Sequence, residues 1–412
     1  MSEKYREEYE VGFSPRLLME EASRCLLCLD APCSSSCPAG TDPAKFIRSL
    51  RFKNVKGAAE TVRINNILGA ICARVCPTER YCQAGCSRSG IDKPIEIGLI
   101  QRYITDFEDA LKMDILEVKE SNGKKVAVVG SGPAGLTVAA ELAKDGYQVT
   151  IYEKEAKAGG YLRYGIPEYR LPNAVVDKEI KRIVELGVDI VLNTKVGEDV
   201  KMEQLRKEYD AVVLSVGYSE GKMLPMFENN RKVIKAVDWL KKTKDKKGNV
   251  KVPENVLVVG GGDVAMDVVT SLKLLGCPHV TDVVYEQFSE FRASKKELEN
   301  AQEQGVTIID GYVPVAVARG GIVKFKHRVI PAELKVKADL IILAVGQVPN
   351  ADGLGVELEK GEVKARGVRV PDTNVFFAGD IGHGEKTVVW GVRSGKEVAF
   401  EVKRFLGGKN NG

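Results

Sequence analysis

Long apolar runs and an excess of one charge are both missing from this sequence. No stretch of about 18 uninterrupted apolar residues occurs, so no transmembrane helix is predicted. Lys and Arg number 61 against 57 Asp and Glu, which leaves a formal net charge of +4. This small excess disfavours nucleic-acid and membrane-surface roles, which need a concentrated basic face. The charged residues 1–13 contain no apolar core and predict no signal peptide. We therefore expect a cytoplasmic protein that binds neither nucleic acid nor membrane.

Histidine is rare, and cysteine is nearly absent after residue 86. The three histidines are His279, His327 and His383, and each is more typical of a structural or surface position than of a general acid. Cys277 follows the apolar pattern "LLG" and is interpreted as a small apolar residue at a helix end. No side chain is therefore predicted to be catalytic.

Eight cysteines are concentrated in two short segments instead. The segment "CLLCLDAPCSSSC" at 25–37 has the spacing C-x2-C-x4-C-x3-C, and "CARVCPTERYCQAGC" at 72–86 has C-x3-C-x5-C-x3-C. Disulfides are rare in the cytosol, and zinc ribbons usually offer two C-x2-C knuckles. Iron–sulfur cubanes take four ligands, mostly thiolates and often from separate segments. The spacing favours iron–sulfur ligation over zinc, within a first domain that the apolar periodicity predicts to be helical.

From residue 124 the sequence pattern predicts alternating strands and helices. Gly130, Gly132 and Gly135 form G-x-G-x-x-G directly after the apolar strand "VAVV". In a dinucleotide fold these glycines allow the turn, the approach of a pyrophosphate and close packing of the next helix. Glu153 ends the following strand about 20 residues on, where an acid accepts the ribose hydroxyls. The segment predicts a Rossmann unit.

The same pattern returns at 254, where Gly260, Gly262 and Ala265 follow the strand "VLVV". Near the chain end, "AGD" places Asp380 after a short apolar strand, where an acid suits a flavin; a helix N-cap is the alternative role. The order predicts an α/β fold: a helical iron–sulfur domain (1–120), then two Rossmann-like domains, the second inserted in the first. FAD is expected in 121–220 with 346–412, and NAD(H) in 221–345.

Several segments resemble one family over nearly the whole chain. "ASRCLLCLDAPCSSSCPAGTDPAKFIRS", "GGYLRYGIPEYRLP" and "GGGDVAMDV" resemble the small subunit of bacterial NAD-dependent dihydropyrimidine dehydrogenase, with the glutamate synthase small subunit as the nearest rival. The resemblance implies two 4Fe-4S clusters. One would take Cys25, Cys28, Cys33 and Cys86, and the other Cys37, Cys76, Cys82 and Gln101. Cys72 would then be a non-ligand beside the cluster; Cys72 as the last ligand, with Gln101 on a helix surface, is the alternative.

The fingerprints and the resemblance together give the predicted cofactor-binding positions. Arg170 is among them as an FAD contact, with a surface cation as its alternative role. The full set is Gly130, Ser131, Gly132, Pro133, Ala134, Gly135, Glu153, Gly160, Arg170, Val196, Gly260, Gly261, Gly262, Asp263, Ala265, Tyr285, Glu286, Arg292, Gly346, Gly379, Asp380 and Thr387.

The end of the second strand in the inserted unit predicts which nucleotide binds. NADP sites usually place Arg or Lys there to pair with the 2′-phosphate. Here Tyr285 and Glu286 occupy that place, and a glutamate repels a phosphate but accepts ribose hydroxyls. We predict NADH, although Arg292 is close enough in sequence to reach a phosphate.

The resemblance implies an electron-input subunit. NADH would reduce FAD, and electrons would pass through two 4Fe-4S clusters to an FMN-containing catalytic subunit. The two kinds of subunit would form a hetero-oligomer, expected to be a heterotetramer. That partner would reduce uracil or thymine to the 5,6-dihydropyrimidine, reversibly. The FMN barrel of the long fused relatives is not expected in this sequence. The rivals are a glutamate synthase small subunit and another NAD(P)H-oxidising flavoprotein subunit.

Overall fold

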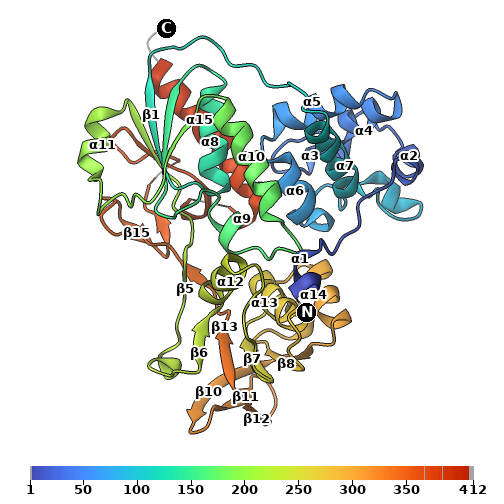
Figure 1. Ribbon diagram of the computed structural model, residues 1–412, viewed down its shortest axis with the longest axis vertical. Helices are drawn as coiled ribbons and strands as arrows, with labels where there is room; N and C mark the ends of the chain where they lie inside the picture. Colours follow the sequence, from blue (N-terminus) through green and yellow to red (C-terminus); the bar gives the residue numbers. More distant parts are fainter. Residues whose placement is uncertain (1, 366, 383, 408–412) are drawn as a thin grey trace. The chain divides into compact units, whose positions relative to one another are not determined.

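The computed structural model describes residues 2–365, 367–382 and 384–407; His383 and the last residues of the predicted FAD segment lie outside them. The chain forms two compact units (Figure 1). The larger unit holds the described residues of 10–162, 173–217 and 350–412. The smaller unit holds those of 1–9, 163–172 and 218–349. The division into three domains stays a prediction.

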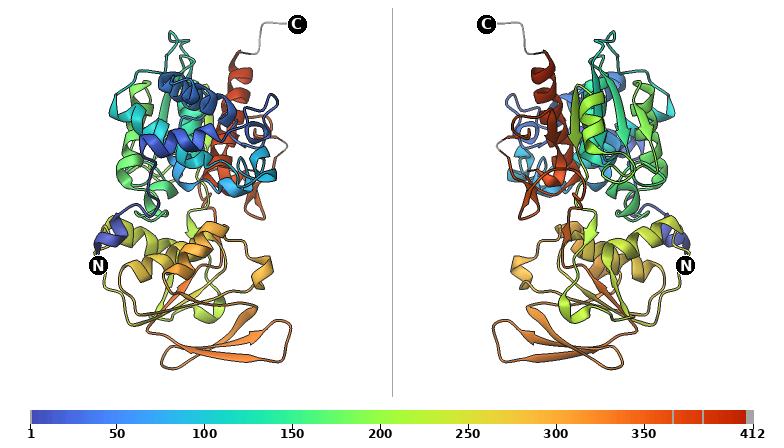
Figure 2. Two further views of the ribbon diagram at one scale, coloured as in Figure 1. Left: turned by 90° about the vertical axis from the view of Figure 1, so that its right-hand side faces the viewer. Right: turned by 90° about the vertical axis from the view of Figure 1, so that its left-hand side faces the viewer.

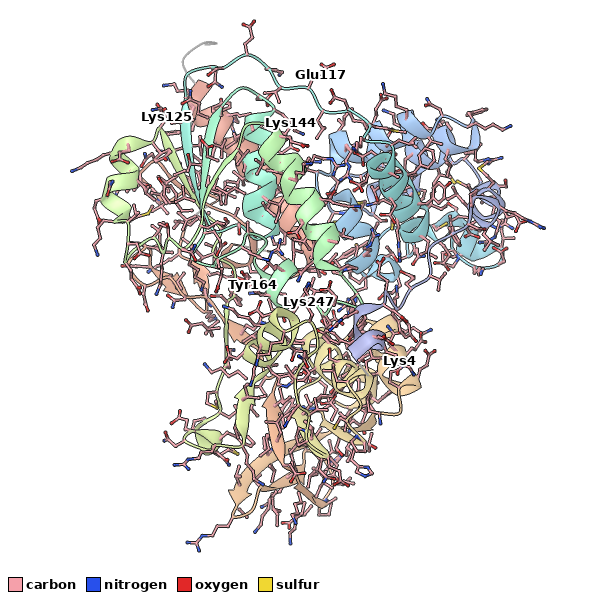
Figure 3. All side chains as sticks on the ribbon, viewed as in Figure 1. Lys4, Glu117, Lys125, Lys144, Tyr164 and Lys247 are labelled. Atoms are coloured by element: carbon pink, nitrogen blue, oxygen red, sulfur yellow. The ribbon has the colours of Figure 1, made fainter. Side chains whose placement is uncertain are left out.

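The larger unit contains a five-stranded parallel sheet with β1 at its centre, in the order β17–β4–β1–β2–β3. The strands are β1 (Lys125–Val129), β2 (Gln148–Tyr152), β3 (Asp189–Val191), β4 (Ala211–Leu214) and β17 (Val375–Phe377). After Lys125 every residue of β1 is buried, as expected for a strand covered on both faces. Figure 3 labels Lys125 and Lys144 at the same end of the sheet. Since Lys144 caps the carboxyl end of the next helix, α8 (Pro133–Ala143), the glycine turn lies at the other end.

Helix α8 packs along α15 (Val388–Gly407), and the two lie side by side in Figure 1. Gly395 permits this approach, because a Cβ there would lie 2.7 Å from the Thr137 Cβ. The remaining elements of this α/β part are α10 (Asn173–Glu185), α11 (Met202–Glu208), β15 (Leu358–Glu359), β16 (Glu362–Val363) and η5 (Gly379–Ile381); α9 (Tyr161–Tyr164) bridges the two units in sequence.

The cysteine-rich part of the larger unit is helical, as predicted. Its elements are α2 (Pro15–Ser23), α3 (Pro32–Ser35), α4 (Pro43–Arg51), α5 (Val55–Asn65), α6 (Gly69–Val75), η1 (Thr78–Arg80), η2 (Ser87–Gly90) and α7 (Ile97–Ala110). Phe46, Leu50, Val62 and Ile100 bury their side chains in one core between these helices. Cys33 lies within α3 and Cys72 within α6, and the other six cysteines of the two segments lie in loops, bends and turns between the helices.

The smaller unit repeats the parallel sheet, with the order β6–β13–β7–β8–β9. The strands are β6 (Val233–Lys235), β7 (Asn255–Val259), β8 (His279–Val283), β9 (Thr307–Ile309) and β13 (Leu340–Leu343). Its other elements are α1 (Ser2–Arg6), β5 (Glu220–Gly221), η3 (Pro225–Phe227), α12 (Ala236–Asp245), α13 (Asp263–Leu274), η4 (Phe288–Glu290), α14 (Lys295–Glu303) and β14 (Gln347–Val348). A second, antiparallel sheet joins β10 (Tyr312–Ala318), β11 (Ile322–His327) and β12 (Glu333–Lys337), the orange ribbons of Figure 2.

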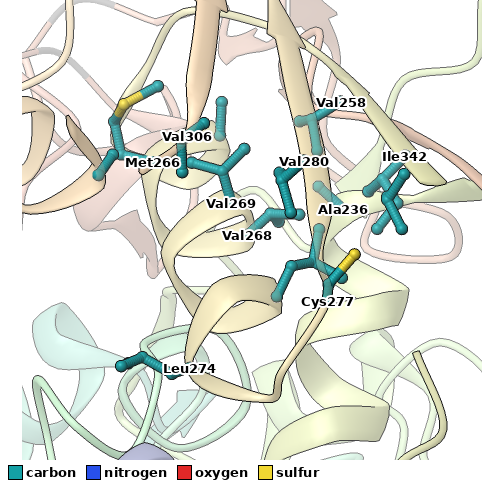
Figure 4. Close-up of a cluster of buried hydrophobic side chains, with 14 of the residues drawn as sticks. Ala236, Val258, Met266, Val268, Val269, Leu274, Cys277, Val280, Val306 and Ile342 are labelled. Atoms are coloured by element: carbon teal, nitrogen blue, oxygen red, sulfur yellow. The ribbon is translucent and has the colours of Figure 1, made fainter. Parts of the chain in front are cut away.

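One core of the smaller unit lies between α13 and the parallel sheet. Val258 and Val280 of the sheet meet Met266 and Val269 of the helix (Figure 4). Cys277 is buried in the same core, in keeping with its interpretation as a small apolar residue. Among the described residues no helix combines the length and apolar character that a bilayer crossing needs.

Candidate cofactor sites

The first glycine turn leaves room for a ligand at the amino end of α8. Gly130 has φ 101°, and a Cβ there would lie 2.7 Å from the Ser215 carbonyl oxygen. Gly160, at φ 52°, approaches from a second loop, so that a Cβ on it would lie 2.9 Å from the Gly132 Cα. A Cβ on Gly132 itself would meet no atom of the described residues within 4 Å. Open space before free helix amides fits the pyrophosphate of a dinucleotide.

Glu153 closes this turn from the end of β2. Its Oε2 accepts hydrogen bonds from the Ser131 backbone N–H at 3.0 Å and from the Ser131 hydroxyl at 2.5 Å. Its Oε1 accepts from the Glu155 N–H at 2.9 Å. The Ser131 hydroxyl in turn accepts from the Gly159 N–H, next to Gly160. Glu153 is only 4% exposed, so the turn, the acid and the second loop form one fixed network.

The C-terminal segment reaches the same helix. A Cβ on Gly379, at φ 78°, would lie 2.9 Å from the Ala134 Cβ. Asp380 lies within η5, whose N-cap is Ala378, so the N-cap role considered for Asp380 is wrong there. Burial raises the pKa of the Asp380 carboxyl, although Lys386 opposes the shift. Gly379 therefore lies against the first turn of α8, and the contact of this segment with FAD stays a prediction.

Two further predicted positions lie in the same unit. Val196 is buried and forms a single β-bridge with Val200. The Thr387 hydroxyl accepts from the Trp390 N–H at the start of α15. Their contacts with a cofactor stay predictions.

The second glycine turn follows β7 in the smaller unit. Gly260 has φ 153° and sits against the Ala344 carbonyl oxygen. A Cβ on Gly262 would meet no atom of the described part of the chain within 4 Å, so space again remains before a helix, here α13. Asp263 accepts a hydrogen bond from the Ser294 N–H at 2.6 Å, and Ala265 is fully buried.

The predicted acid of this second unit reaches its turn. The Glu286 Oε2 lies 3.2 Å from the position of a Cβ on Gly261. Its Oε1 lies 3.3 Å from Nε of Arg292, and the glutamate side chain is 20% exposed. The sequence-predicted Gly261, Glu286 and Arg292 thus come together. Gly346, at φ 102°, follows β13 in the same unit beside Lys222.

One residue at this end was missed by the sequence analysis. The Arg328 guanidinium lies 4.0 Å from the centre of the Tyr285 ring. Its Nη1 donates to the Tyr285 carbonyl oxygen at 3.1 Å. Arg328 follows β11 of the antiparallel sheet, which lies outside the glycine fingerprint, so no spacing rule pointed to it.

Arg170 is bound inside the smaller unit. Its guanidinium pairs with Asp267 of α13 at 2.7 Å and with Glu297 of α14 at 3.0 Å. It is therefore not the surface cation of the alternative reading, and its contact with FAD stays a prediction. Burial raises the pKa of Asp267 to about 7, although Arg170 opposes the shift.

The first four predicted cysteine ligands form one set. Burial, together with the nearby Cys86 and Cys25, raises the pKa of the Cys33 thiol to about 11. Burial also raises the pKa of Cys25, with Cys86 and Cys28 adding to the shift. Cys25, Cys28, Cys33 and Cys86 are therefore close enough to interact, although two of them come from opposite ends of the cysteine-rich region.

The other four cysteines form a second set that adjoins the first: burial raises the pKa of Cys82, and both Cys37 of this set and Cys33 of the first set add to the shift. Burial raises the pKa of Cys76 well above its ordinary value, with contributions from Cys72, Cys82 and Cys37. Burial raises the pKa of Cys72 to about 12, opposed by a hydrogen bond with Asn66. Within the described residues no three Cys, His, Asp or Glu side chains converge on a single-ion site. A cubane is larger than one ion and separates its ligands farther, and its iron would stabilise thiolates that burial alone disfavours.

Gln101 is buried on α7, so its alternative role as a surface helix residue is wrong. Its Nε2 donates to the Gly69 carbonyl oxygen at 2.7 Å, in the first turn of α6, which carries Cys72. With the amide nitrogen used in this way, the amide oxygen is the atom left for a metal. Ligation by Gln101 or Cys72 stays open.

A buried ion network supports the same helix and was also missed. Arg63 donates from Nε to Glu108 at 2.7 Å and from Nη1 to Glu179 at 2.8 Å. Arg182 bonds both carboxylates from the other side. The Glu179 Oε2 also accepts from the Ala70 N–H at 3.3 Å. The network joins α5 and α7 of the cysteine-rich part to α10 and to the first turn of α6.

Known proteins with similar sequences decide the family. The model for dihydropyrimidine dehydrogenase domain II, 4Fe-4S cluster, matches residues 2–113, and that for pyridine nucleotide-disulphide oxidoreductases matches 124–395. The PreT subunit of NAD-dependent dihydropyrimidine dehydrogenase from Escherichia coli is 51% identical over 407 residues, 98% of each chain. The chain belongs to the PreT family.

The PreT family is related to glutamate synthase small chains. The NADPH-type small chain from Halomonas elongata is 31% identical over 447 aligned positions, covering 98% of this chain and 94% of that one. Among solved structures, FprA of Mycobacterium tuberculosis in complex with NADPH aligns at a TM-score of 0.60 and 16% identity, covering 69% of this chain and 85% of FprA. That likeness supports the fold alone. The chain is thus an oxidoreductase subunit with a 4Fe-4S domain and an FAD/NAD-binding region.

Proposed function

We propose that the chain is the electron-input subunit of a cytoplasmic NAD-dependent dihydropyrimidine dehydrogenase. It would oxidise NADH at FAD and pass electrons through two 4Fe-4S clusters to an FMN-containing partner, which reduces uracil or thymine reversibly. The observation that carries the proposal is the presence of two open glycine turns, each with its acid, in one chain with two sets of interacting thiols. When bound, the flavin accepts a hydride and the clusters carry single electrons.

The chain's own residues would hold and separate the two nucleotides. The turn around Gly132, clamped by Glu153 and Gly160, would hold the FAD pyrophosphate and ribose. The turn around Gly262 would hold the NADH pyrophosphate, and Glu286 would accept the adenosine ribose hydroxyls. A 2′-phosphate would meet the Glu286 carboxylate, so the side chain disfavours NADPH.

The two thiol sets differ in their access to a partner. All four cysteines of the first set are partly exposed, whereas Cys72 and Cys82 of the second set are buried. Leu29, within the first cysteine segment, is 91% exposed. The second set lies near Lys396 of α15: burial lowers the pKa of this lysine, and the nearby Cys37 opposes the shift. We therefore propose that electrons leave through the first set.

For the ligands we propose Cys25, Cys28, Cys33 and Cys86 for one cluster, and Cys37, Cys76, Cys82 and Gln101 for the other. The Gln101 hydrogen bond to Gly69 supports this choice, because a partner on one amide atom orients the other, as neighbours of metal ligands commonly do. Anaerobic iron and sulfide analysis of Cys72→Ala and Gln101→Cys tests it. Retention of both clusters in Cys72→Ala is expected; loss of a whole cluster contradicts the Gln101 assignment.

The direct test of function is an anaerobic titration of the reconstituted chain with NADH. We expect bleaching of the flavin band near stoichiometric NADH, reduction of the clusters, and a much weaker response to NADPH. A flavin that NADH does not bleach contradicts the proposal.

The partner is tested separately by anaerobic co-purification from native cytosol. An FMN-containing chain that reduces uracil with NADH, when recombined with this chain, is expected. A large glutamate synthase subunit would contradict the pyrimidine role while leaving the cofactors intact.

A further inference from the structure

The adenosine end of the second dinucleotide site is completed by an element outside the Rossmann pattern. Tyr285 follows β8 and is 52% exposed. The guanidinium of Arg328, from the end of β11, lies over its ring at 4.0 Å. A cation at this distance is attracted to the ring face and holds a side chain that would otherwise turn freely in solvent.

The position of Arg328 is itself fixed. Its backbone N–H donates to the Gly311 carbonyl oxygen at 2.8 Å. Its Nη1 donates to the Tyr285 carbonyl oxygen at 3.1 Å and lies 3.4 Å from a Glu290 carboxylate oxygen. The preceding His327 accepts at Nδ1 from two backbone N–H groups of the following turn. Through these contacts the arginine links the antiparallel sheet to the loop after β8.

The residues on either side of Tyr285 contact the second glycine turn. Val284 packs so closely on the glycine turn that a Cβ on Gly261 would lie 2.3 Å from its Cγ1. Glu286 lies beside the same glycine. A shift of Tyr285 therefore displaces neighbours on both sides of it, one against the pyrophosphate turn and the other at the ribose position.

We propose that Arg328 is a positioning and specificity residue for the nicotinamide cosubstrate. It holds Tyr285 as a platform on which the adenine ring stacks and keeps Glu286 at the ribose. The inference rests on the proposed oxidation of NADH. Glu290 pairs with Arg328, and Glu286 pairs with Arg292. A 2′-phosphate would therefore compete with two carboxylates for these arginines. This favours the unphosphorylated nucleotide.

The test compares Arg328→Ala, Arg328→Lys, Tyr285→Ala and the double Ala variant in the full, cofactor-loaded chain with ferricyanide as acceptor. For Arg328→Ala, KM for NADH is expected to rise about 5- to 30-fold, while kcat and the flavin-to-protein ratio stay within about twofold. Lysine should restore part of the loss, because it keeps the charge but not the planar fork. Arg319→Ala, in the exposed turn of the same sheet, is the matched control.

The double variant distinguishes this role from general damage. If arginine acts through the tyrosine, the double variant should lose little more than either single variant, so the losses are not additive. An unchanged NADH KM in Arg328→Ala, additive losses, or weaker NADPH use with NADH use intact would each overturn the proposal. Arg328→Lys carries the test if Arg328→Ala does not fold. Wild-type flavin reduction by NADH is measured first, so failure of the proposed function is seen separately.

Discussion

The two glycine turns of this chain are built alike, but their acids are held differently. Glu153 is buried and accepts three hydrogen bonds from the protein, two of them from Ser131. Glu286 is partly exposed and pairs with Arg292, a side chain that is itself 82% exposed. An exposed pair of this kind contributes little to stability.

The difference matches the two tasks proposed for the sites. An acid already fixed by protein donors needs no ordering when its ligand binds, which suits a nucleotide that stays bound through many turnovers. An acid in contact with water can exchange a ribose for solvent at little cost. We infer that tight internal bonding of the acid marks the resident FAD, and that looser bonding marks the exchangeable NADH.

Gly160→Val should break the first site most severely. The new Cβ would lie 2.9 Å from the Gly132 Cα at a φ of 52°, which costs at least about 2 kcal/mol in backbone strain and contact. The flavin-to-protein ratio after desalting is expected to fall more than about tenfold. Gly90→Ala, whose Cβ meets no described atom within 4 Å, is the control. Normal flavin content in Gly160→Val would show that the second loop is not part of the site.

The larger unit contains a buried ion network around Arg63, and Arg63→Met tests how much this network stabilises the unit. The substitution leaves Glu108 and Glu179 buried with only Arg182 between them. A loss of about 3–5 kcal/mol in the free energy of unfolding is expected, measured by urea unfolding of the holoprotein. Arg393→Ala removes an exposed pair with Glu397 and should cost less than about 1 kcal/mol. Equal losses in the two variants would count against the network.

Glu286→Gln sharpens the contrast between the acids. Loss of a charged hydrogen-bond acceptor at the ribose should raise KM for NADH about 10- to 100-fold and leave the flavin content unchanged. Glu153→Gln should show the reverse pattern, with flavin loss as its first effect. Steady-state kinetics and flavin absorbance separate the two. Flavin loss from Glu286→Gln would contradict the proposal that Glu286 serves the NADH site and not the FAD site.

Asp282→Val should stabilise the smaller unit. Asp282 is the counterpart in β8 of Ile151 in β2, since they pair with Val258 and Val128 of the central strands. Its carboxyl is buried without a hydrogen-bond partner in the described part of the chain, and burial raises its pKa well above the ordinary value. A gain of about 1–3 kcal/mol in the free energy of unfolding is expected at pH 8.

The pH dependence of that gain gives the sharper test. A raised pKa in the folded state means that the contribution of Asp282 is fully present below about pH 4, the unfolded value, and is lost as pH rises toward the folded pKa. The advantage of Asp282→Val should therefore be smaller at pH 5 than at pH 8 in scanning calorimetry. A gain that does not change with pH would mean that Asp282 is not ionising as argued.

Local spacing predicted the parts of this structure that depend on neighbours in sequence. The glycine turns, the acids after β2 and β8, and the helical cysteine region follow from patterns within about 30 residues. Arg63 and Arg170 could not be placed in this way. Arg63 meets Glu179 at a separation of 116 residues, and Arg170 meets Asp267 at 97. Arg328 depends on a sheet inserted after the fingerprint. Such contacts are set by tertiary packing, which a local pattern does not encode.

The network of Arg63, Glu108, Glu179 and Arg182 also bears on how this protein can be divided. In sequence, a boundary near residue 120 separates cysteine-rich helices from flavin-type strands. A fragment cut there would keep Arg63 and Glu108 but lose both partners on α10, and would expose a charged seam. The cysteine region is therefore a poor candidate for expression alone or for transplantation, and any chimaera that borrows it should carry α10 as well.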